Sequence, residues 1–336
     1  MLKPFLRLFC KPKNPAVRSA VNPNDDSEHA SAFSETDWIE PEIVIAESEL
    51  DLADLPKAAG AFVRQIVRDA LKDELELPIM PELGLAVRRK TLDPLSSASD
   101  LTLIIQTDIA ITTKLIQVAN SPLYAGYEPI QSLNEAVARI GMAAVRDIVT
   151  GLTIKQIFVT EQPRLRRRMR DLWEHSARVA ANCSVLARHQ IGVDPEQALL
   201  AGLVHDIGEL AIIKYANALS FDELSDEALV EAIDHLSGKL GALMLRQWNL
   251  DDEFVFAALH ADNFRRESEA VVRLVDLVQV AQLHLLSGTP TSEAMDLSAA
   301  PAVKHLGLAL DDSQQGIAIL NEARQDIEQV RAALAI

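Results

Sequence analysis

Aromatic residues and glycine are scarce in this 336-residue sequence, which limits the folds that it can adopt. Aromatic side chains make up 4% of the residues and there are 13 glycines, whereas hydrophobic residues reach 49%. Leucine, alanine, isoleucine and valine must therefore build most of the core, and turn-rich β architectures usually need more glycine. No alternating pattern is long enough for a reliable strand and no repeat of fixed period is visible. The sequence predicts an all-α fold.

Cysteine and long apolar runs are also missing. Cys10 and Cys183 are the two cysteines, too few for a disulfide framework and without the spacing of a zinc knuckle. No apolar run approaches the roughly 20 residues that a membrane-spanning helix needs. Pro4 and Arg7 interrupt the first apolar stretch and no small-residue cleavage site follows, so a secretory signal is not expected. We expect a cytoplasmic protein.

Positive charge is outnumbered, because the formal net charge is −17. Such a field repels nucleic acid unless a local basic patch overrides it. Residues 164–170 hold five arginines, which leaves a basic nucleic-acid patch open as an alternative. No aromatic residues interleave with them, so we interpret the run as a solvated connector between two helical halves and expect no nucleic-acid partner.

The first 50 residues read as a flexible tail. Residues 1–20 carry five basic and no acidic residues, and residues 19–56 carry eleven acidic residues and no lysine or arginine. An abrupt reversal of charge of this kind is typical of a tail rather than of a packed domain. Residues 1–13 could form a short amphipathic helix with weak membrane-surface contact, or the basic end could fold back on its acidic neighbour.

Helical periodicity starts near Leu52 and continues through most of the chain. Prolines interrupt it at residues 77–81, Asn120-Ser121-Pro122 stops a helix, and Gly141 and Gly151 punctuate the following ones. We expect helices over 133–140, 143–150, 152–158, 227–236, 238–247, 253–260, 269–286 and 311–334, with Ser99 or Asp100 capping a helix from Leu101 and Asp194 opening another. Residues 288–301 read as a loop.

The sharpest chemical signal is the run Ala201-Gly-Leu-Val-His-Asp-Ile-Gly208. A His-Asp pair, here His205 and Asp206, offers an imidazole nitrogen and a carboxylate, the ligands of a metal-dependent phosphohydrolase. His175 lies 30 residues upstream on a predicted helix. The alternative is a buried pair kept for packing, in which the carboxylate fixes the imidazole.

This pattern resembles the HD superfamily and, within it, the HDOD family. The resemblance covers about residues 71–287. It includes the segments Leu77-Pro-Ile-Met-Pro81, Leu115-Ile-Gln-Val-Ala-Asn-Ser-Pro122, the Ile140-Gly141 step, the His-Asp element, Trp248-Asn249-Leu250 and His260. It implies a two-lobed helical fold with a degenerate HD-like C-terminal lobe. The implied divisions are a tail over 1–50, an HDOD domain over 51–287 and a loop with a C-terminal helix over 288–336. The domain would hold an N-terminal lobe over about 71–160 and the HD-like lobe over about 171–287.

The resemblance also implies a signalling role and a weakened metal site. His175, His205 and Asp206 match the ligand set of HD hydrolases, and His260 could add a ligand. The position of a further histidine holds Ser237, and His235 would point elsewhere. The closing aspartate matches Gln282, with Asp276 as the alternative if the helix is shifted. No Gly-Tyr-Pro element follows the His-Asp pair.

Other residues have structural as well as functional readings. Asn120 and Ser121 are expected to stop a helix through backbone hydrogen bonds, although a pocket shared between the lobes is the functional alternative. Trp248 is expected to fill the core, and His260 to be a core or rim histidine.

These observations favour a bacterial regulatory protein whose HDOD domain is a protein-interaction output module without hydrolase activity. Its partner is an unidentified signalling protein. No cofactor is expected, although a divalent metal at His175, His205, Asp206, His260 and Asp276 stays open. The alternatives are a metal-dependent phosphohydrolase or cyclic-dinucleotide phosphodiesterase, and a membrane-surface adaptor. The oligomeric state is not predicted.

Overall fold

The structure, a computed structural model, describes residues 43, 57–72, 74–121, 124, 126, 128–160, 162–218, 225–268, 270–286, 297–310 and 317–334. The predicted tail over 1–50 and its proposed membrane helix over 1–13 lie outside this part, Ile43 apart. The helices are α1 (Lys57–Leu71), α2 (Glu82–Thr91), α3 (Ala98–Ile105), α4 (Ile109–Ala119), α5 (Leu133–Ile140), α6 (Met142–Ile154), α7 (Pro163–Ala187), α8 (Pro195–Val204), α9 (Ile207–Ala218), α10 (Asp226–Gln247), α11 (Asp252–His260), α12 (Leu274–Leu286), α13 (Pro301–His305), α14 (Ala318–Glu322) and α15 (Arg324–Leu334).

The prediction of an all-α fold is confirmed. Among the described residues the only β pairing is an isolated bridge between Leu310 and Ile317. None of the described helices is both long and apolar enough to cross a membrane.

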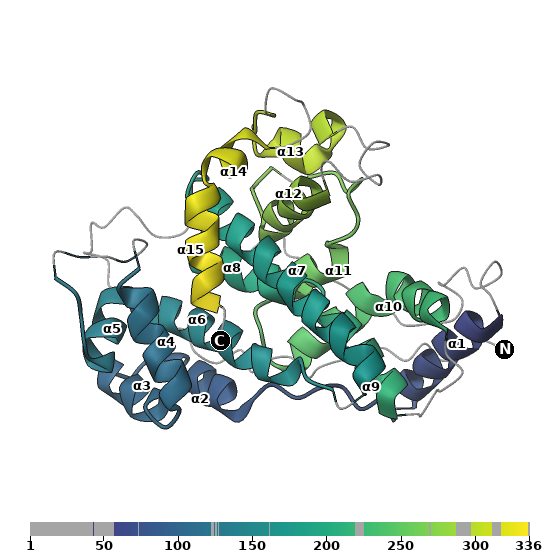
Figure 1. Cartoon of the computed structure of the whole chain (residues 1–336), viewed down its shortest axis with the longest axis horizontal. Coiled ribbons are helices and arrows are strands. Elements are labelled where there is room, and N and C mark those ends of the chain that lie inside the picture. The colour runs from purple at the N-terminus through teal and green to yellow at the C-terminus, as the bar shows by residue number, and fades with distance from the viewer. Residues whose placement is uncertain are drawn as a thin grey trace, which may run out of the picture.

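The helices form two lobes, which meet where α6 packs against α8 (Figure 1). Helices α2 to α6 make the N-terminal lobe, and α7 to α12 make the HD-like lobe. Helix α1 packs on α10 of the HD-like lobe, although it precedes the N-terminal lobe in the chain. Helix α15 lies along α7 and also contacts α4, so the C-terminal helix touches both lobes.

Capping residues explain where several helices begin. The side chain of Ser97 accepts a hydrogen bond from the backbone of Asp100, whose carboxylate accepts one in return from Ser97. The expected cap was Ser99 or Asp100, so the helix starts two to three residues earlier than predicted. Ser132 and Glu135 form the same reciprocal pair at α5, and Asp194 caps α8 as expected.

Gly151, predicted to separate two helices, lies inside one, and the break predicted between residues 236 and 238 falls within α10. Gly151 is part of α6, and a Cβ atom there would lie 2.6 Å from Leu203 Cδ1. Gly238 is part of α10, 3.0 Å from the carbonyl oxygen of Leu259 by the same measure. Both glycines therefore permit a close approach to another helix, which a single sequence does not reveal. Gly141 does lie between two helices, with a φ of 87° that favours glycine.

Other segments also differ from the predictions. The arginine run over 164–170 is not a connector between halves but the first two turns of α7, and Arg168 pairs with Glu209 of α9 at 2.8 Å. The helix expected over 269–286 begins at Leu274. The final predicted helix is divided into α14 and α15. The expected loop over 288–301 holds a short 3-10 helix over Leu297–Ala299, and α13, whose Ala302 and Val303 are buried, begins at its last residue.

The two lobes are joined through segments far apart in sequence. Trp248, at the end of α10, donates from Nε1 to the carbonyl oxygen of Pro78 at 3.0 Å. Arg88 of α2 is 4% exposed and donates to the carbonyl oxygen of Asn249 at 3.3 Å. Asn249 has a φ of 55°, which turns its carbonyl toward this arginine at the end of the helix. The Trp-Asn element therefore fastens the proline-rich segment and α2 to the HD-like lobe.

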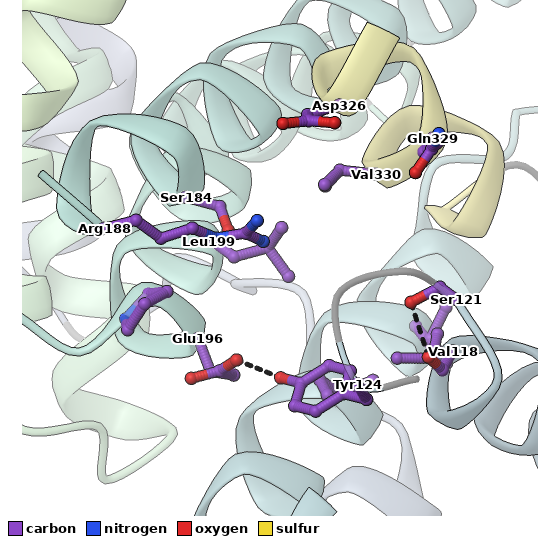
Figure 2. Close-up of a pocket in the computed structure, with 13 residues that line it drawn as sticks. Val118, Ser121, Tyr124, Ser184, Arg188, Glu196, Leu199, Asp326, Gln329 and Val330 are labelled. Atoms are coloured by element: carbon purple, nitrogen blue, oxygen red, sulfur yellow. Dashed lines mark hydrogen bonds between the residues drawn. The ribbon is translucent and has the colours of Figure 1, made fainter. Parts of the chain in front are cut away.

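A cavity of about 150 Å³ lies between the lobes, where α4 and α6 face α7, α8 and α15 (Figure 2). Ser121 lines this cavity, and its hydroxyl donates to the carbonyl oxygen of Val118 at 2.6 Å. Asn120 is exposed and both donates to and accepts from the backbone of Ile130, at 2.7 and 2.9 Å. Asn120 therefore clamps the loop after α4, and Ser121 has both a backbone bond and a place in the cavity wall.

We expect Gly208→Ala to lower the free energy of unfolding by about 1–3 kcal/mol or more. A Cβ atom at Gly208 would lie 1.8 Å from the carbonyl oxygen of Ser237 and 2.6 Å from the backbone nitrogen of Gly241, so α9 and α10 would have to separate. Urea denaturation followed by circular dichroism measures the change. Gly60→Ala is the matched control, because its nearest neighbours are the flexible end of Arg64, and we expect no loss of stability there. Equal effects at the two sites would contradict this explanation.

Candidate metal site

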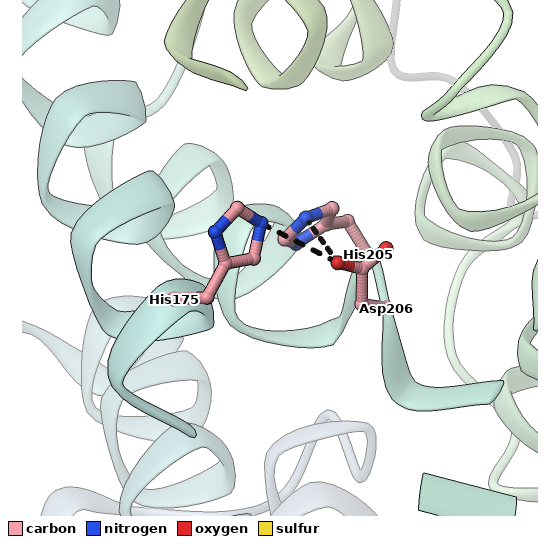
Figure 3. Close-up of side chains that lie close together, drawn as sticks. All are labelled: His175, His205 and Asp206. Atoms are coloured by element: carbon pink, nitrogen blue, oxygen red, sulfur yellow. Dashed lines mark ion pairs between the residues drawn. The ribbon is translucent and has the colours of Figure 1, made fainter. Parts of the chain in front are cut away.

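Three of the predicted site residues converge on the HD-like lobe (Figure 3). His175 comes from the middle of α7, His205 from the end of α8, and Asp206 from the short link to α9. One ligand atom from each lies within 4.8 Å of the others. Asp206 Oδ2 is 3.0 Å from His205 Nε2 and 3.4 Å from His175 Nε2. The carboxylate oxygen thus faces both imidazoles.

Burial differs sharply among the three side chains. The His205 side chain is fully buried, that of Asp206 is 17% exposed and that of His175 is 36% exposed. The cluster is therefore closed beneath His205 and open to solvent beside His175. An ion could reach it from the open side without displacing a helix.

The backbone fixes which nitrogen of His205 is free for binding. His205 Nδ1 lies 2.8 Å from the carbonyl oxygen of Gly202, so Nδ1 donates there. Nε2 is buried and has no well-directed hydrogen-bond partner, although it lies next to Asp206. An unprotonated Nε2 would place a lone pair against a carboxylate. A second proton or a cation between the two groups removes that repulsion.

The charges of the cluster stabilise one another. Burial opposes protonation of His205, but the Asp206 carboxylate outweighs it, and the pKa of His205 is raised. Burial would raise the pKa of Asp206, but the two histidines hold it well below its usual range. Burial raises the pKa of Glu209, opposed by Arg168. Asp206 therefore stays ionised, as a metal ligand must be.

The structure does not bring the other two candidates, His260 and Asp276, to this cluster. The ring of His260 packs on Phe256 with centroids 4.4 Å apart, and burial followed by the charges of Arg266 and Arg273 lowers the pKa of His260. This environment is that of a rim histidine.

Asp276 is fully buried in a separate network. It accepts hydrogen bonds from Arg266, from the hydroxyl of Ser268 at 2.9 Å and from the backbone of Arg273 at 2.9 Å. His305 Nδ1 of α13 lies 3.4 Å away. These partners occupy the carboxylate oxygens. Asp276 therefore connects the loop that follows α11 with helices α12 and α13.

Gln282 and Ser237 also lie at packed positions. Gln282 Nε2 donates to the carbonyl oxygen of Ala261 at 3.1 Å, and Ser237 is buried where α9 crosses α10. His235 bonds to the carbonyl oxygen of Glu231 one turn earlier on its own helix. None of these side chains supplies a carboxylate to the cluster.

An acidic residue that sequence reasoning missed lies near the cluster. Burial raises the pKa of Asp262, and the charge of Asp206 raises it further. Asp262 is nevertheless exposed at the surface, two residues after the end of α11. Its oxygens lie outside the group of converging ligand atoms. The sequence does show a carboxylate, Asp262, just beyond the helix that carries His260. It does not show in which direction that side chain points.

The three converging side chains fit one divalent cation but not a pair. Two imidazole nitrogens and a carboxylate are a common ligand set for a single ion, with the remaining positions open to water. The observation that favours such a fit is that His205 Nε2 is buried, faces Asp206 Oδ2 at 3.0 Å and makes no well-directed hydrogen bond. A second ion would need further carboxylates, and Asp276 is already engaged.

Residues 77–264, more than half of the chain, match the HDOD domain family. The chain belongs to the HDOD family. The HDOD match includes the whole N-terminal lobe, the His-Asp cluster and the Trp248 contact between the lobes, and ends before α12.

Solved structures share the HDOD fold. A protein from Shewanella amazonensis SB2B, provisionally described as a metal-dependent phosphohydrolase, is 25% identical, with a TM-score of 0.72 over 83% of this chain and 100% of that one. An HDOD domain protein of unknown function from Geobacter sulfurreducens is 21% identical, with a TM-score of 0.57 over 82% of this chain and 96% of that one. A protein from Marinobacter aquaeolei VT8, provisionally described as a signal transduction protein, is 20% identical, with a TM-score of 0.55 over 85% of this chain and 69% of that one.

Among curated proteins, an uncharacterized protein of Treponema pallidum (strain Nichols) is 21% identical over 222 residues, or 62% of this chain. The match spans 42% of that relative, so this HDOD chain covers less than half of its length.

Proposed function

We propose that this HDOD chain is a regulatory signal-transduction protein that acts through protein partners and does not hydrolyse phosphoesters. The observation that carries the proposal is the engagement of Asp276. The carboxylate that could complete a two-metal site is buried among Arg266, Ser268 and Arg273 instead. The Marinobacter structure, provisionally described as a signal transduction protein, supports a signalling role by analogy of fold.

If a divalent ion binds, His175, His205 and Asp206 hold it. Such an ion would supply Lewis-acid polarisation of a bound phosphate or water. The protein's own contribution is clearer. Gly202 orients the imidazole of His205, burial beneath that ring excludes water from one side, and Asp206 remains anionic between the histidines.

We expect no phosphoesterase activity from the purified chain and at most one divalent ion per chain. The reason is that three ligand atoms converge and a second carboxylate does not. The measurements are metal content of protein purified without chelator and hydrolysis of bis(p-nitrophenyl) phosphate and cyclic dinucleotides. His205→Ala and Asp206→Asn should remove any bound ion, whereas the exposed His189→Ala should not.

The alternative is a metal-dependent phosphohydrolase, favoured by the Shewanella structure and by Asp262 near the cluster. Turnover that persists in His189→Ala, and that His205→Ala, Asp206→Asn and Asp262→Asn each abolish, would establish this alternative and end the main proposal. In that case Asp262, rather than Asp276, completes the site.

We also propose a cytoplasmic location, supported by the free thiol of Cys183 in the core. From the sequence, we also propose weak membrane contact through residues 1–13. Deletion of those residues should reduce binding to anionic liposomes, and unchanged binding would end the idea.

A further inference from the structure

We propose that the cavity between the lobes binds a small zwitterion with an apolar body, of the α-amino acid class. This site is separate from the His-Asp cluster and does not depend on whether the chain hydrolyses phosphoesters. The cavity lies where both lobes and the C-terminal helix meet, so its occupant would touch all three (Figure 2).

One wall carries an exposed cation, Arg188, that has no ion pair with a described residue. Arg188 directly follows α7, and its guanidinium reaches toward the centre of the cavity. It makes no hydrogen bond or ion pair with any residue that the structure describes. Arg188 is also the cationic side chain among the residues lining this cavity. A guanidinium with free donors is suited to a planar carboxylate.

Beside it lies a polar side chain that is almost completely buried. Ser184 is 2% exposed and lies one turn before Arg188 on α7. Its hydroxyl faces the cavity and has no hydrogen-bond partner among the described residues (Figure 2). The hydroxyl oxygen is not among the fully buried atoms, so water in the cavity can bond to it and a ligand carboxylate can take the place of that water. Together with Arg188, the hydroxyl makes one half of a carboxylate site.

The opposite wall offers negative charge. Asp326 of α15 lines the cavity, is exposed to solvent and forms no ion pair with a described residue. Glu196 lies on the near side, below Arg188 in the figure, where the hydroxyl of Tyr124 donates to its carboxylate. The carboxylate of Asp326 therefore suits an ammonium group, whereas Glu196 is already hydrogen-bonded to Tyr124 in the cavity wall.

The space between these charges is apolar and small. Ile148, Leu152, Leu199 and Val330 come from both lobes and from α15. A cavity of about 150 Å³ suits a benzene-sized apolar group, and polar ends can extend to its walls. This volume favours a ligand of roughly ten non-hydrogen atoms over a dinucleotide. An anionic end, a cationic end and a branched apolar body together describe an amino acid such as leucine.

The test is isothermal titration calorimetry of the full chain with L-valine, L-leucine and L-methionine. Two singly charged analogues of leucine, 4-methylpentanoate and 3-methylbutylamine, separate the roles of the charged ends. We expect at least one amino acid to bind, and each leucine analogue to bind at least about tenfold more weakly than leucine, because each loses one charged hydrogen-bonded contact. Absence of binding by all three amino acids, or equal binding of leucine and 4-methylpentanoate, would overturn the proposal.

Variants assign the site to the cavity. We expect Arg188→Gln and Ser184→Ala each to weaken amino-acid binding, with a loss of at least about tenfold for the arginine. Arg170→Gln is the matched control, because Arg170 is exposed on the same helix and distant from the cavity. Circular dichroism confirms that each variant is folded. Binding unchanged in Arg188→Gln would place the ligand elsewhere and refute the assignment. His205→Ala should leave amino-acid binding intact, so this experiment tests the amino-acid site independently of the metal-site proposal.

Discussion

Asp276→Ala should lower the free energy of unfolding by about 3–5 kcal/mol, because it leaves buried positive charge without its counter-charge. The side chain of Asp276 is completely buried and that of Arg266 is 9% exposed. The variant also removes the acceptor for Ser268 and for the backbone of Arg273. Urea denaturation of the purified variant measures the change.

The same variant separates the structural role of Asp276 from a role in metal binding. We expect the folded fraction of Asp276→Ala to carry as much divalent metal as the wild type, because Asp276 lies outside the converging ligands. A folded, fully stable variant that has lost its metal would show that Asp276 is a ligand after all. Asp276→Asn keeps the shape of the side chain and should fall between the wild type and alanine in stability.

A second large effect is expected where the lobes meet. Asp147 of α6 is 1% exposed and pairs with Arg146 through two bonds of 2.7 and 2.9 Å. Arg88, also buried, lies 3.7 Å from the same carboxylate. Asp147→Ala therefore leaves Arg88 without compensation beside its bond to Asn249, and we expect a loss of about 3–5 kcal/mol in the free energy of unfolding.

The control for Asp147→Ala is Asp171→Ala. Asp171 pairs with Arg167 at 3.5 Å on the exposed surface of α7, where water screens the interaction, so its removal should not measurably change the denaturation midpoint. A similar loss in both variants would mean that burial does not decide the effect. Because Arg88 belongs to α2 and Asn249 follows α10, the Asp147 variant should also weaken the contact between the lobes.

Local signals in the sequence predicted the helices well. The helix over 133–140 is observed with the same bounds, because Ser132 and Glu135 cap its start and Gly141 ends it. Tertiary packing decided the misses. Gly151 was expected to separate two helices but is needed where another helix passes closely, as is Gly238 inside α10. A glycine in one sequence does not show whether its missing Cβ serves a turn or a contact.

The sequence likewise predicted part of the candidate site. His175, His205 and Asp206 converge because α7 and α8 pack side by side, and the resemblance to the HDOD family pointed to all three. The sequence could not show that Asp276 pairs with Arg266 and lies beside His305. These two residues lie on a loop and on a short helix whose positions no sequence pattern predicts. Asp262 was missed for the same reason, since the chain beyond α11 has no periodicity.

The length of α7 has a mechanical consequence. This helix of 25 residues carries His175 in its middle, and Ser184 and Arg188 at its end. At 1.5 Å per residue, the 13 steps from His175 to Arg188 span about 20 Å of one stiff rod. Helices α8, α12 and α15 all pack along it. A sliding or rolling of the rod at one end must therefore shift the imidazole, because a continuous α-helix has no hinge in which to absorb the movement.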